Sequence, residues 1–403
     1  MLPLLSIALG AFAIGTEGFM LAGLLPAMSG DLGVSIPAVG QLVTVFSLTF
    51  ALGSPVLAVS TGHVDRKRLL MGSMVVFALG NFLAAMAHGY GTLLVARIIM
   101  ALAASAYMPA ASAYAAATAP ERRGRAISLI YVGLNLATVV GAPLGVFFGG
   151  HFGWRPTFLG VAALAVLAMG GIWWMLAPRA AARPATFAER LSVARLPEVL
   201  GALVVNVVAQ IGIFALYTYL APFLYRTVGI AGSGVAAVLF LYGAGGVAGN
   251  LIGGAAVDRF PSRRLLAAIF ASLAALFMLL SLAGHALPAP VRLPVVVALI
   301  LLWGLINYAF PSVQQTRLVR MEPRLAPVTL SLNASATYLG ISLGAALGSL
   351  VVAHGGELSL GFVAGACELL GLVALRLEPE MAPSASEAAG PYSESNATTR
   401  PGH

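Results

Sequence analysis

Charged side chains are scarce in this chain of 403 residues, which has 22 Lys and Arg and 14 Asp and Glu, so that only 9% of its residues are charged. Soluble domains carry roughly 25% charged residues. Because 60% of the residues are apolar, most of the surface is expected to face lipid. The scarcity of charge argues against a soluble enzyme, a nucleic-acid binder and a disordered scaffold.

Cysteine and clustered histidine are also lacking. The single cysteine, Cys367, allows no internal disulfide. The six His residues lie far apart and show no metal-ligand spacing such as HxxxH. The sequence therefore predicts no metal site and no other cofactor.

The net charge of +8 is distributed as in membrane proteins. Eighteen of the 22 basic residues fall in alternate connections between apolar segments, in the central linker or in the tail. Such an asymmetry follows the positive-inside rule. It predicts that both termini are cytoplasmic, and it does not indicate a nucleic-acid partner.

Long uncharged stretches predict the membrane spans. Ten stretches carry no charged residue, and two more are interrupted by a single acid, Glu17 or Glu368. A helix needs about 20 mostly apolar residues to cross a bilayer, which predicts an all-α membrane protein with twelve transmembrane helices at about residues 4–27, 38–61, 69–88, 91–117, 126–149, 156–176, 199–224, 234–256, 265–285, 293–316, 327–352 and 358–375. No Lys or Arg precedes the first apolar run, which we interpret as a retained helix rather than a secretory signal.

Two segments interrupt this pattern. Residues 177–198 are rich in Pro, Ala and Arg, and we predict a cytoplasmic linker there, with a short surface helix at 186–195 capped by Thr186. Residues 377–403 are rich in Ser, Ala and Pro, and we predict a disordered cytoplasmic tail. The predicted domains are a six-helix bundle at 1–176 and a second at 199–376.

The two bundles share a repeated loop. Residues 64–66 and 257–259 both read Val-Asp-Arg, each followed by a basic pair and by Leu-Leu, in the connections after spans two and eight. Chance similarity of two basic loops is the alternative to an internal duplication. The shared Asp and the matching position in each half favour duplication.

These loops resemble a signature of the major facilitator superfamily. Residues 62–70 are similar, in shortened form, to its GxLaDrxGrR loop, and residues 254–264 are closer to it. Residues 97–101 (RIIMA) resemble its RxxQG segment in span four, with Met100 and Ala101 in place of Gln and Gly.

Three more segments resemble the drug:proton antiporters with twelve spans. Residues 141–145 (GAPLG) are similar to their Gly-Pro signature in span five, and residues 153–158 (GWRPTF) to the WR..F that follows it. Residues 15–19 (GTEGF) with 24–26 (LLP) resemble the opening of the sugar- and chloramphenicol-efflux branch.

The resemblance covers about residues 1–376. It implies two six-helix halves around a central cavity, with substrate near the midplane. It further implies a secondary transporter in the cytoplasmic (inner) membrane, which exports small organic compounds, drug-like or sugar-like, against inward proton movement. Proton-coupled uptake or sugar export in the same fold remains an alternative, and a membrane-embedded enzyme or a channel is a more distant one. The predicted partners are a small-molecule substrate, protons and the lipid bilayer, and the chain is predicted to be a monomer and not an enzyme.

Glu17 and Arg97 are the predicted proton-coupling residues. Glu17 lies near the middle of span one, where an ionisable group is costly and is a functional candidate by default. Arg97 lies at a comparable depth in span four and must be paired or reach water. We predict a Glu17–Arg97 pair, direct or through water, in which protonation of the acid releases the arginine. The alternatives are a Glu17 that only packs and an Arg97 that extends to the interface.

Two further sets of residues are assigned conformational roles. The resemblance implies a latch in which Asp65 and Asp258 each cap a neighbouring helix and pair with arginine, with Arg66 and Arg259 beside them. Positive-inside topology is the alternative explanation for the two acids and the favoured one for the flanking basic residues. In span five, Gly141, Pro143 and Gly145 favour a bending, gate-forming helix over ordinary packing.

Polar and aromatic residues near mid-span are candidates to line the cavity, although any one of them can instead join two helices. The set describes aromatic walls with few charges, suited to neutral or weakly cationic amphiphiles. Glu368, in the last span, is predicted to be peripheral. The candidates are Gln41, Tyr107, Tyr131, Asn135, Gln210, Tyr217, Tyr242, Asn307, Tyr308, Asn333 and Tyr338.

Overall fold

The computed structural model describes residues 2–118, 122–178, 186–321 and 325–378, and the described chain contains helices and no strand. The N-terminal half consists of α1 (Leu2–Leu32), α2 (Ile36–Ser60), α3 (Arg66–Ala85), α4 (Tyr90–Thr118), α5 (Arg123–Leu136), the π-helix η2 (Ala137–Gly141), α6 (Ala142–Phe152) and α7 (Trp154–Met175). The linker helix α8 spans Phe187–Ala194. The C-terminal half consists of α9 (Pro197–Tyr217), α10 (Leu220–Val228), α11 (Ser233–Val257), α12 (Ser262–Ala286), α13 (Ala289–Met321), α14 (Ala326–Ala353), the short 3-10 helix η4 (Glu357–Ser359) and α15 (Leu360–Leu377).

Twelve segments of the described chain are long and apolar enough to cross a membrane. They fall at the predicted positions, so the prediction of an all-α protein with twelve transmembrane helices is confirmed. Two spans are irregular. The fifth consists of α5, η2 and α6, and α9 of the seventh is followed after two residues by α10.

Local sequence explains where several helices begin and end. The Ser35 side chain accepts a hydrogen bond from the backbone N–H of Ala38 and caps α2. Gly153 separates α6 from α7 with a φ of 85°, and Gly229 ends α10 with a φ of 72°. Both values lie in the left-handed region that glycine adopts without strain.

The linker helix α8 is confirmed where it was predicted. Thr186 and Glu189 form a reciprocal capping box, in which each side chain accepts a hydrogen bond from the backbone N–H of the other residue. The Arg190 guanidinium donates to Ser331 Oγ of α14 at 2.6 Å, which attaches α8 to the C-terminal half.

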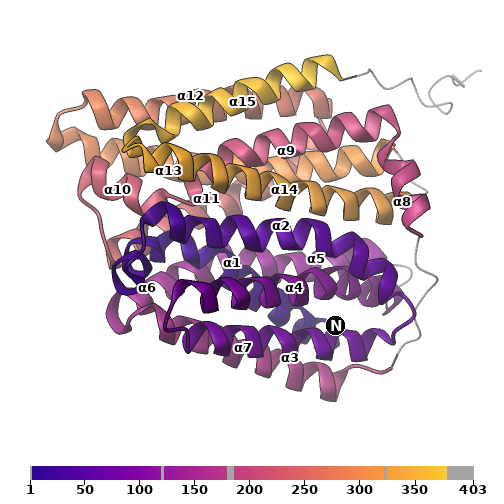
Figure 1. Cartoon of the computed structure of the whole chain (residues 1–403). Coiled ribbons are helices and arrows are strands. Elements are labelled where there is room, and N and C mark those ends of the chain that lie inside the picture. The colour runs from indigo at the N-terminus through magenta and orange to yellow at the C-terminus, as the bar shows by residue number, and fades with distance from the viewer. Residues whose placement is uncertain (1, 119–121, 179–185, 322–324, 379–403) are drawn as a thin grey trace, which may run out of the picture.

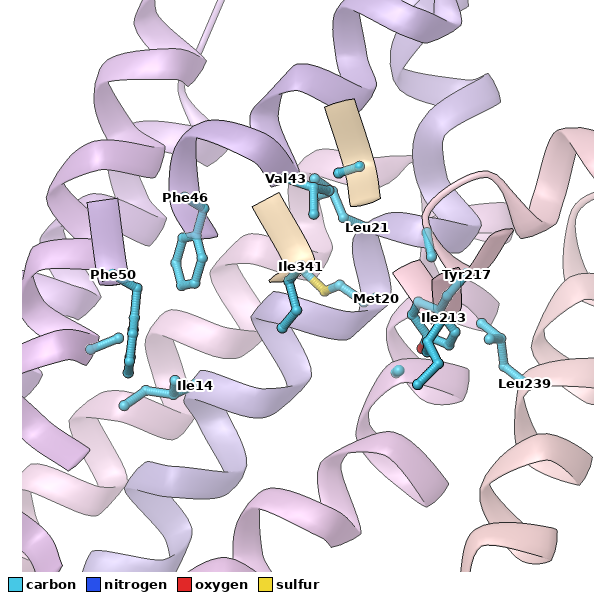
Figure 2. Packing of buried hydrophobic residues seen from close by; sticks show 14 of the residues in the cluster. Ile14, Met20, Leu21, Val43, Phe46, Phe50, Ile213, Tyr217, Leu239 and Ile341 are labelled. Atoms are coloured by element: carbon cyan, nitrogen blue, oxygen red, sulfur yellow. The ribbon is translucent and has the colours of Figure 1, made fainter. Parts of the chain in front are cut away.

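The two halves lie side by side, and their helices run roughly parallel (Figure 1). We call the end that holds α8 the linker side and the opposite end, which holds α6 and α10, the α10 side. Helices α1, α2, η2 and α6 of one half contact α10, α11 and α14 of the other. Figure 2 shows side chains of both halves, Val43 and Phe46 of α2 and Ile341 of α14, turned toward the interior.

Large apolar side chains cover much of the outer surface, as expected for a protein in lipid. Trp174 is 88% exposed and Leu251 of α11 is 71% exposed. In a soluble protein such a surface would be unusual. The observed surface therefore agrees with the scarcity of charge in the sequence.

One predicted boundary is wrong by two residues. Leu377 and Glu378 were assigned to a disordered tail, but Leu377 ends α15, and Glu378 is buried and forms an ion pair with Arg317 of α13. A buried acid with an arginine partner is ordered because the pair satisfies both charges. The rest of the predicted tail, 379–403, lies outside the described residues.

Candidate functional site

A buried ion pair joins spans one and four at mid-depth. The Arg97 guanidinium of α4 donates to Glu17 Oε1 of α1, and both side chains are 0% exposed. The predicted pair is thus present, and it is direct. Two charges taken out of water at this depth are tolerated because each is the counter-ion of the other.

The pair is only partly satisfied by its surroundings. Arg97 Nε donates to the Leu42 carbonyl oxygen at 3.2 Å, and the guanidinium lies 4.3 Å from the centre of the Phe46 ring. The other two polar atoms, Glu17 Oε2 and Arg97 Nη2, have no hydrogen-bond partner among the described residues. They leave capacity for a proton, a water or a substrate group.

The C-terminal half reaches this pair through α14. Tyr338 of α14 lies near Arg97. Its ring stacks on Phe50 of α2 with centroids 3.6 Å apart and an interplanar angle of 19°. The Glu17–Arg97 pair therefore lies near a contact between the halves, and a change in the charge of Glu17 acts close to that contact.

Span five packs against span one through glycines. A Cβ at Gly133 would lie 2.9 Å from the Ala8 carbonyl carbon, one at Gly141 would lie 3.0 Å from Thr16 Cβ, and one at Gly145 would lie 3.0 Å from Met20 Cβ. The two helices thus approach closely on the face next to Glu17.

The same span is interrupted by the π-helix η2, immediately before Pro143. The N–H of Ala142 donates to the Ala137 carbonyl oxygen, five residues back. Proline removes one donor of the regular helix, and a π-turn is one way of absorbing the disruption. The π-helix ends at Gly141, in the span for which a bend at Gly141, Pro143 and Gly145 is predicted, and the bending and gating of these residues stay predictions.

The C-terminal half contacts η2 directly. The Tyr308 hydroxyl of α13 donates to Thr138 Oγ1 at 2.5 Å, and a Cβ at Gly243 of α11 would lie 2.5 Å from Val139 Cα. The π-helix therefore lies between span one and two helices of the other half.

Amide side chains form a polar cluster between α9 and α14. The Asn206 amide donates to Asn333 Oδ1 at 3.0 Å and to Thr337 Oγ1 at 2.9 Å. The Gln210 amide donates to Asn206 Oδ1 at 3.5 Å. The sequence predicted Gln210 and Asn333 and missed Asn206, whose four-residue spacing from Gln210 is the signal that could have found it.

Aromatic rings gather where α1, α9, α11, α12 and α13 meet. The Tyr242 and Trp303 ring centres are 5.0 Å apart, those of Tyr217 and Tyr242 are 5.5 Å apart, and the Asn307 amide donates to the Tyr242 hydroxyl at 2.8 Å. Tyr308 also packs against Tyr242, with ring centres 5.9 Å apart, so the structure brings four predicted residues together. Sequence reasoning missed Phe19, Phe214, Phe277 and Trp303, because it considered only amide and tyrosine side chains as candidates.

Other predicted cavity residues are not brought together. The Tyr107 hydroxyl donates to the Ile7 carbonyl oxygen at 2.8 Å, and its side chain is fully buried between α4 and α1. Tyr107 therefore joins two helices, which corrects its assignment to the cavity wall. Gln41, Tyr131 and Asn135 are partly exposed.

The predicted latch residues do not form the inter-helix ion pairs expected of them within the described ranges. Asp65 accepts a hydrogen bond from the backbone N–H of Arg68 at 3.0 Å and so caps its own helix, α3. Asp258 follows the last residue of α11. Within the described ranges neither acid forms an ion pair, and Arg66 and Arg259 form none either. A cap three residues away needs no second helix, and that local bond replaces the expected one.

A cavity of about 440 Å³ opens between the halves on the α10 side. Gly23, Val146 and Ala221 contribute to its mostly apolar wall, and the Arg226–Glu357 ion pair, with a 3.9 Å separation, also borders it. None of the residues predicted to line the substrate cavity borders this one.

Two six-helix halves with a buried ion pair and an irregular helix at their junction have the architecture of a secondary transporter. The chain belongs to the Major Facilitator Superfamily, whose sequence pattern matches residues 7–316 and 202–399. It is therefore a multi-pass membrane protein.

Relatives and solved structures agree with this assignment. The inner membrane transport protein YdhP of Escherichia coli K12 is 33% identical over 94% of this chain and 97% of its own. A chloramphenicol resistance protein of Streptomyces lividans is 32% identical over 87% of this chain and 88% of its own. The crystal structure of a D-xylose-proton symporter shares the fold, with a TM-score of 0.72 and 16% identity over 94% of this chain and 97% of that one.

Proposed function

We propose that this protein is a proton-coupled exporter of small organic compounds that works by alternating access. The observation that carries the proposal is the Glu17–Arg97 pair. This acid and its counter-ion lie together in membrane-spanning helices, and neither side chain is exposed to solvent. Intramembrane ionisable groups mark ion and substrate pathways. The chloramphenicol resistance protein among its relatives supports export as the direction.

The coupling step follows from the electrostatics of the pair. With Glu17 ionised, the pair stays closed, since separating it would leave two uncompensated charges in a medium of low dielectric. A proton on Glu17 cancels the attraction and frees the Arg97 guanidinium. The freed cation then interacts more strongly with its remaining neighbours, the Leu42 carbonyl oxygen and the Phe46 ring.

The contacts between the halves define what must break during the cycle. The Ser342 hydroxyl donates to the Thr44 carbonyl oxygen at 3.0 Å and the Ser349 hydroxyl to that of Pro37 at 3.2 Å, both between α14 and the α10-side part of α2. Opening on that side must break them, together with the Tyr308–Thr138 bond at η2. Each bond is worth only about 1 kcal/mol net, which suits a reversible gate.

The substrate class follows from the aromatic and amide groups that the C-terminal half encloses and from the ion pair of the N-terminal half. Aromatic rings and neutral amides predominate, and the charged pair is already internally compensated. Such a surface favours neutral or weakly cationic amphiphiles, which bind through ring contacts and a few directed hydrogen bonds.

Transport into everted membrane vesicles tests the proposed function. An imposed proton gradient, acidic inside, is expected to drive uptake of a lipophilic drug-like compound from a chemically diverse panel, and a protonophore should abolish it. Empty-vector vesicles provide the control. Uptake that ignores the gradient for every compound transported would contradict proton coupling, and accumulation only in right-side-out vesicles would contradict export.

We further propose that both termini and the linker side are cytoplasmic. The basic residues of the loops support this orientation. A reporter fused after His403, which preserves the Glu378–Arg317 pair, should be active only in its cytoplasmic form. The same reporter inserted after Phe152, between α6 and α7, is the matched control and should show the periplasmic signal. The opposite pair of signals would contradict the proposed topology.

A further inference from the structure

Glu368 is an acid in the last span that the proposed coupling step does not use. Its side chain on α15 is 0% exposed, and neither carboxyl oxygen has a hydrogen-bond partner among the described residues. It was predicted to be peripheral. The structure instead places it in the interior of the C-terminal half, where α15 packs against α9 and α12.

The carboxyl lies directly against the backbone of α9. A Cβ at Gly212 would lie 2.6 Å from Glu368 Oε1, 2.9 Å from the Ala364 carbonyl oxygen and 3.1 Å from Cys367 Cβ. Glycine at 212 therefore admits the acid. Both carboxyl oxygens are inaccessible to solvent. Water therefore cannot solvate an ionised Glu368 in this position.

No cation compensates a charge on Glu368 in the described part of the chain. The titratable group beside it is the Cys367 thiol of its own helix. The charged and imidazole side chains on the helices packed around it stand at the helix ends, away from its middle position. They are Glu198 on α9, Arg263, Arg264 and His285 on α12, His354 after α14, Glu357 on η4, and Arg376 on α15.

An ionised carboxylate that is inaccessible to solvent, and that has no counter-ion or hydrogen-bond donor among the described residues, is strongly disfavoured inside a protein. The neutral acid avoids that penalty. We propose that Glu368 is a second proton-binding site, in the C-terminal half, and that it holds its proton in the conformation described here. Glu17 differs because Arg97 compensates its charge.

Release of this proton requires a movement of α9. The new carboxylate needs water or a donor, and either one needs space between α9 and α15. The opposite face of α9 carries Asn206 and Gln210, which form the polar cluster with α14. Protonation of Glu368 thus stabilises the packing of α9 against α15, and its ionisation favours their separation.

Infrared spectroscopy of the purified, full-length protein in lipid tests this site without any substrate. The C=O stretch of a protonated carboxylic acid is expected at neutral pH in the parent and should exchange slowly in D₂O, because the group is buried. It should disappear in Glu368→Gln and persist in Glu17→Gln, the matched control for an ion-paired acid at similar depth. This protonation depends on neither the direction nor the driving ion of transport.

A second variant makes the assignment independent of the Gln substitution. Glu368→Asp keeps a carboxyl on a shorter side chain and should shift the band in frequency rather than remove it. A neutral-pH spectrum of Glu368→Asp and Glu368→Gln that is identical to that of the parent in this region would overturn the proposal, because Glu368 would then be ionised. Loss of the band in Glu17→Gln alone would overturn it as well.

Discussion

Glu17→Gln is expected to abolish proton-driven accumulation of substrate, a loss of at least about tenfold, which corresponds to about 1.4 kcal/mol. Gln has nearly the shape of protonated Glu but can neither release a proton nor neutralise Arg97. The variant therefore corresponds to one protonation state of the site and cannot complete the cycle. Everted vesicles with an imposed gradient measure the loss. Equilibrium binding at several pH values should show that substrate affinity depends on pH in the parent and does not in the variant.

Stability must be separated from coupling in this experiment. Removing one partner of a buried pair leaves an unpaired charge, at a cost of about 3–5 kcal/mol. The double variant with Glu17→Gln and Arg97→Gln removes both charges, so it should regain stability and still fail to accumulate substrate. Glu17→Asp keeps the carboxyl and should keep part of the activity. Full gradient-driven transport by Glu17→Gln would assign coupling to another acid.

Gly249→Ala is expected to destabilise the C-terminal half more than a change of one methyl group would suggest. A Cβ at Gly249 of α11 would lie 2.7 Å from the Leu305 carbonyl carbon of α13 and 2.9 Å from its Cα, closer than real Cβ contacts. The two helices must move apart, because the obstructing atoms belong to the backbone. Overpacking of this kind costs about 1–3 kcal/mol.

The single cysteine provides the measurement. Cys367 is buried, so a thiol-reactive fluorophore should report its exposure as the protein is heated, and Gly249→Ala should lower the midpoint. Gly254→Ala, on the same helix but with no heavy atom within 4 Å of the added Cβ, is the matched control. It should leave the midpoint unchanged or raise it slightly, since Ala favours a helix by up to about 1 kcal/mol over Gly. Equal midpoints for the two variants would contradict the close approach of α11 and α13.

Composition and charge spacing were sufficient to predict the helices. An uncharged stretch of membrane length has one favourable conformation in lipid, in which each backbone group is satisfied within its own segment. The spans could therefore be located without knowledge of their neighbours. The linker helix was predictable for a similar reason, because Thr186 and Glu189 cap it through residues only three apart.

The pairing of charges was predictable only in part. Glu17 and Arg97 were predicted to meet because each is costly alone at its depth, although they are 80 residues apart. Glu378 was misassigned because a Ser- and Pro-rich stretch follows it, and only the position of Arg317 at the end of α13 shows why it is buried. Asp65 was predicted to cap a neighbouring helix and caps its own.

The sequence by itself determined that this protein spans the membrane twelve times, where its spans lie and that Glu17 and Glu368 fall within them, since these properties depend on the cost of moving each residue from water into lipid. The tertiary structure decided which faces meet. It placed η2 between α1, α11 and α13, gathered the rings around Trp303, and enclosed Glu368 against Gly212, where no described residue forms a hydrogen bond or ion pair with it. The physical reason is that helices in lipid associate through close packing and directed hydrogen bonds rather than through a hydrophobic pattern, and such contacts between distant segments leave little periodic signal in the sequence.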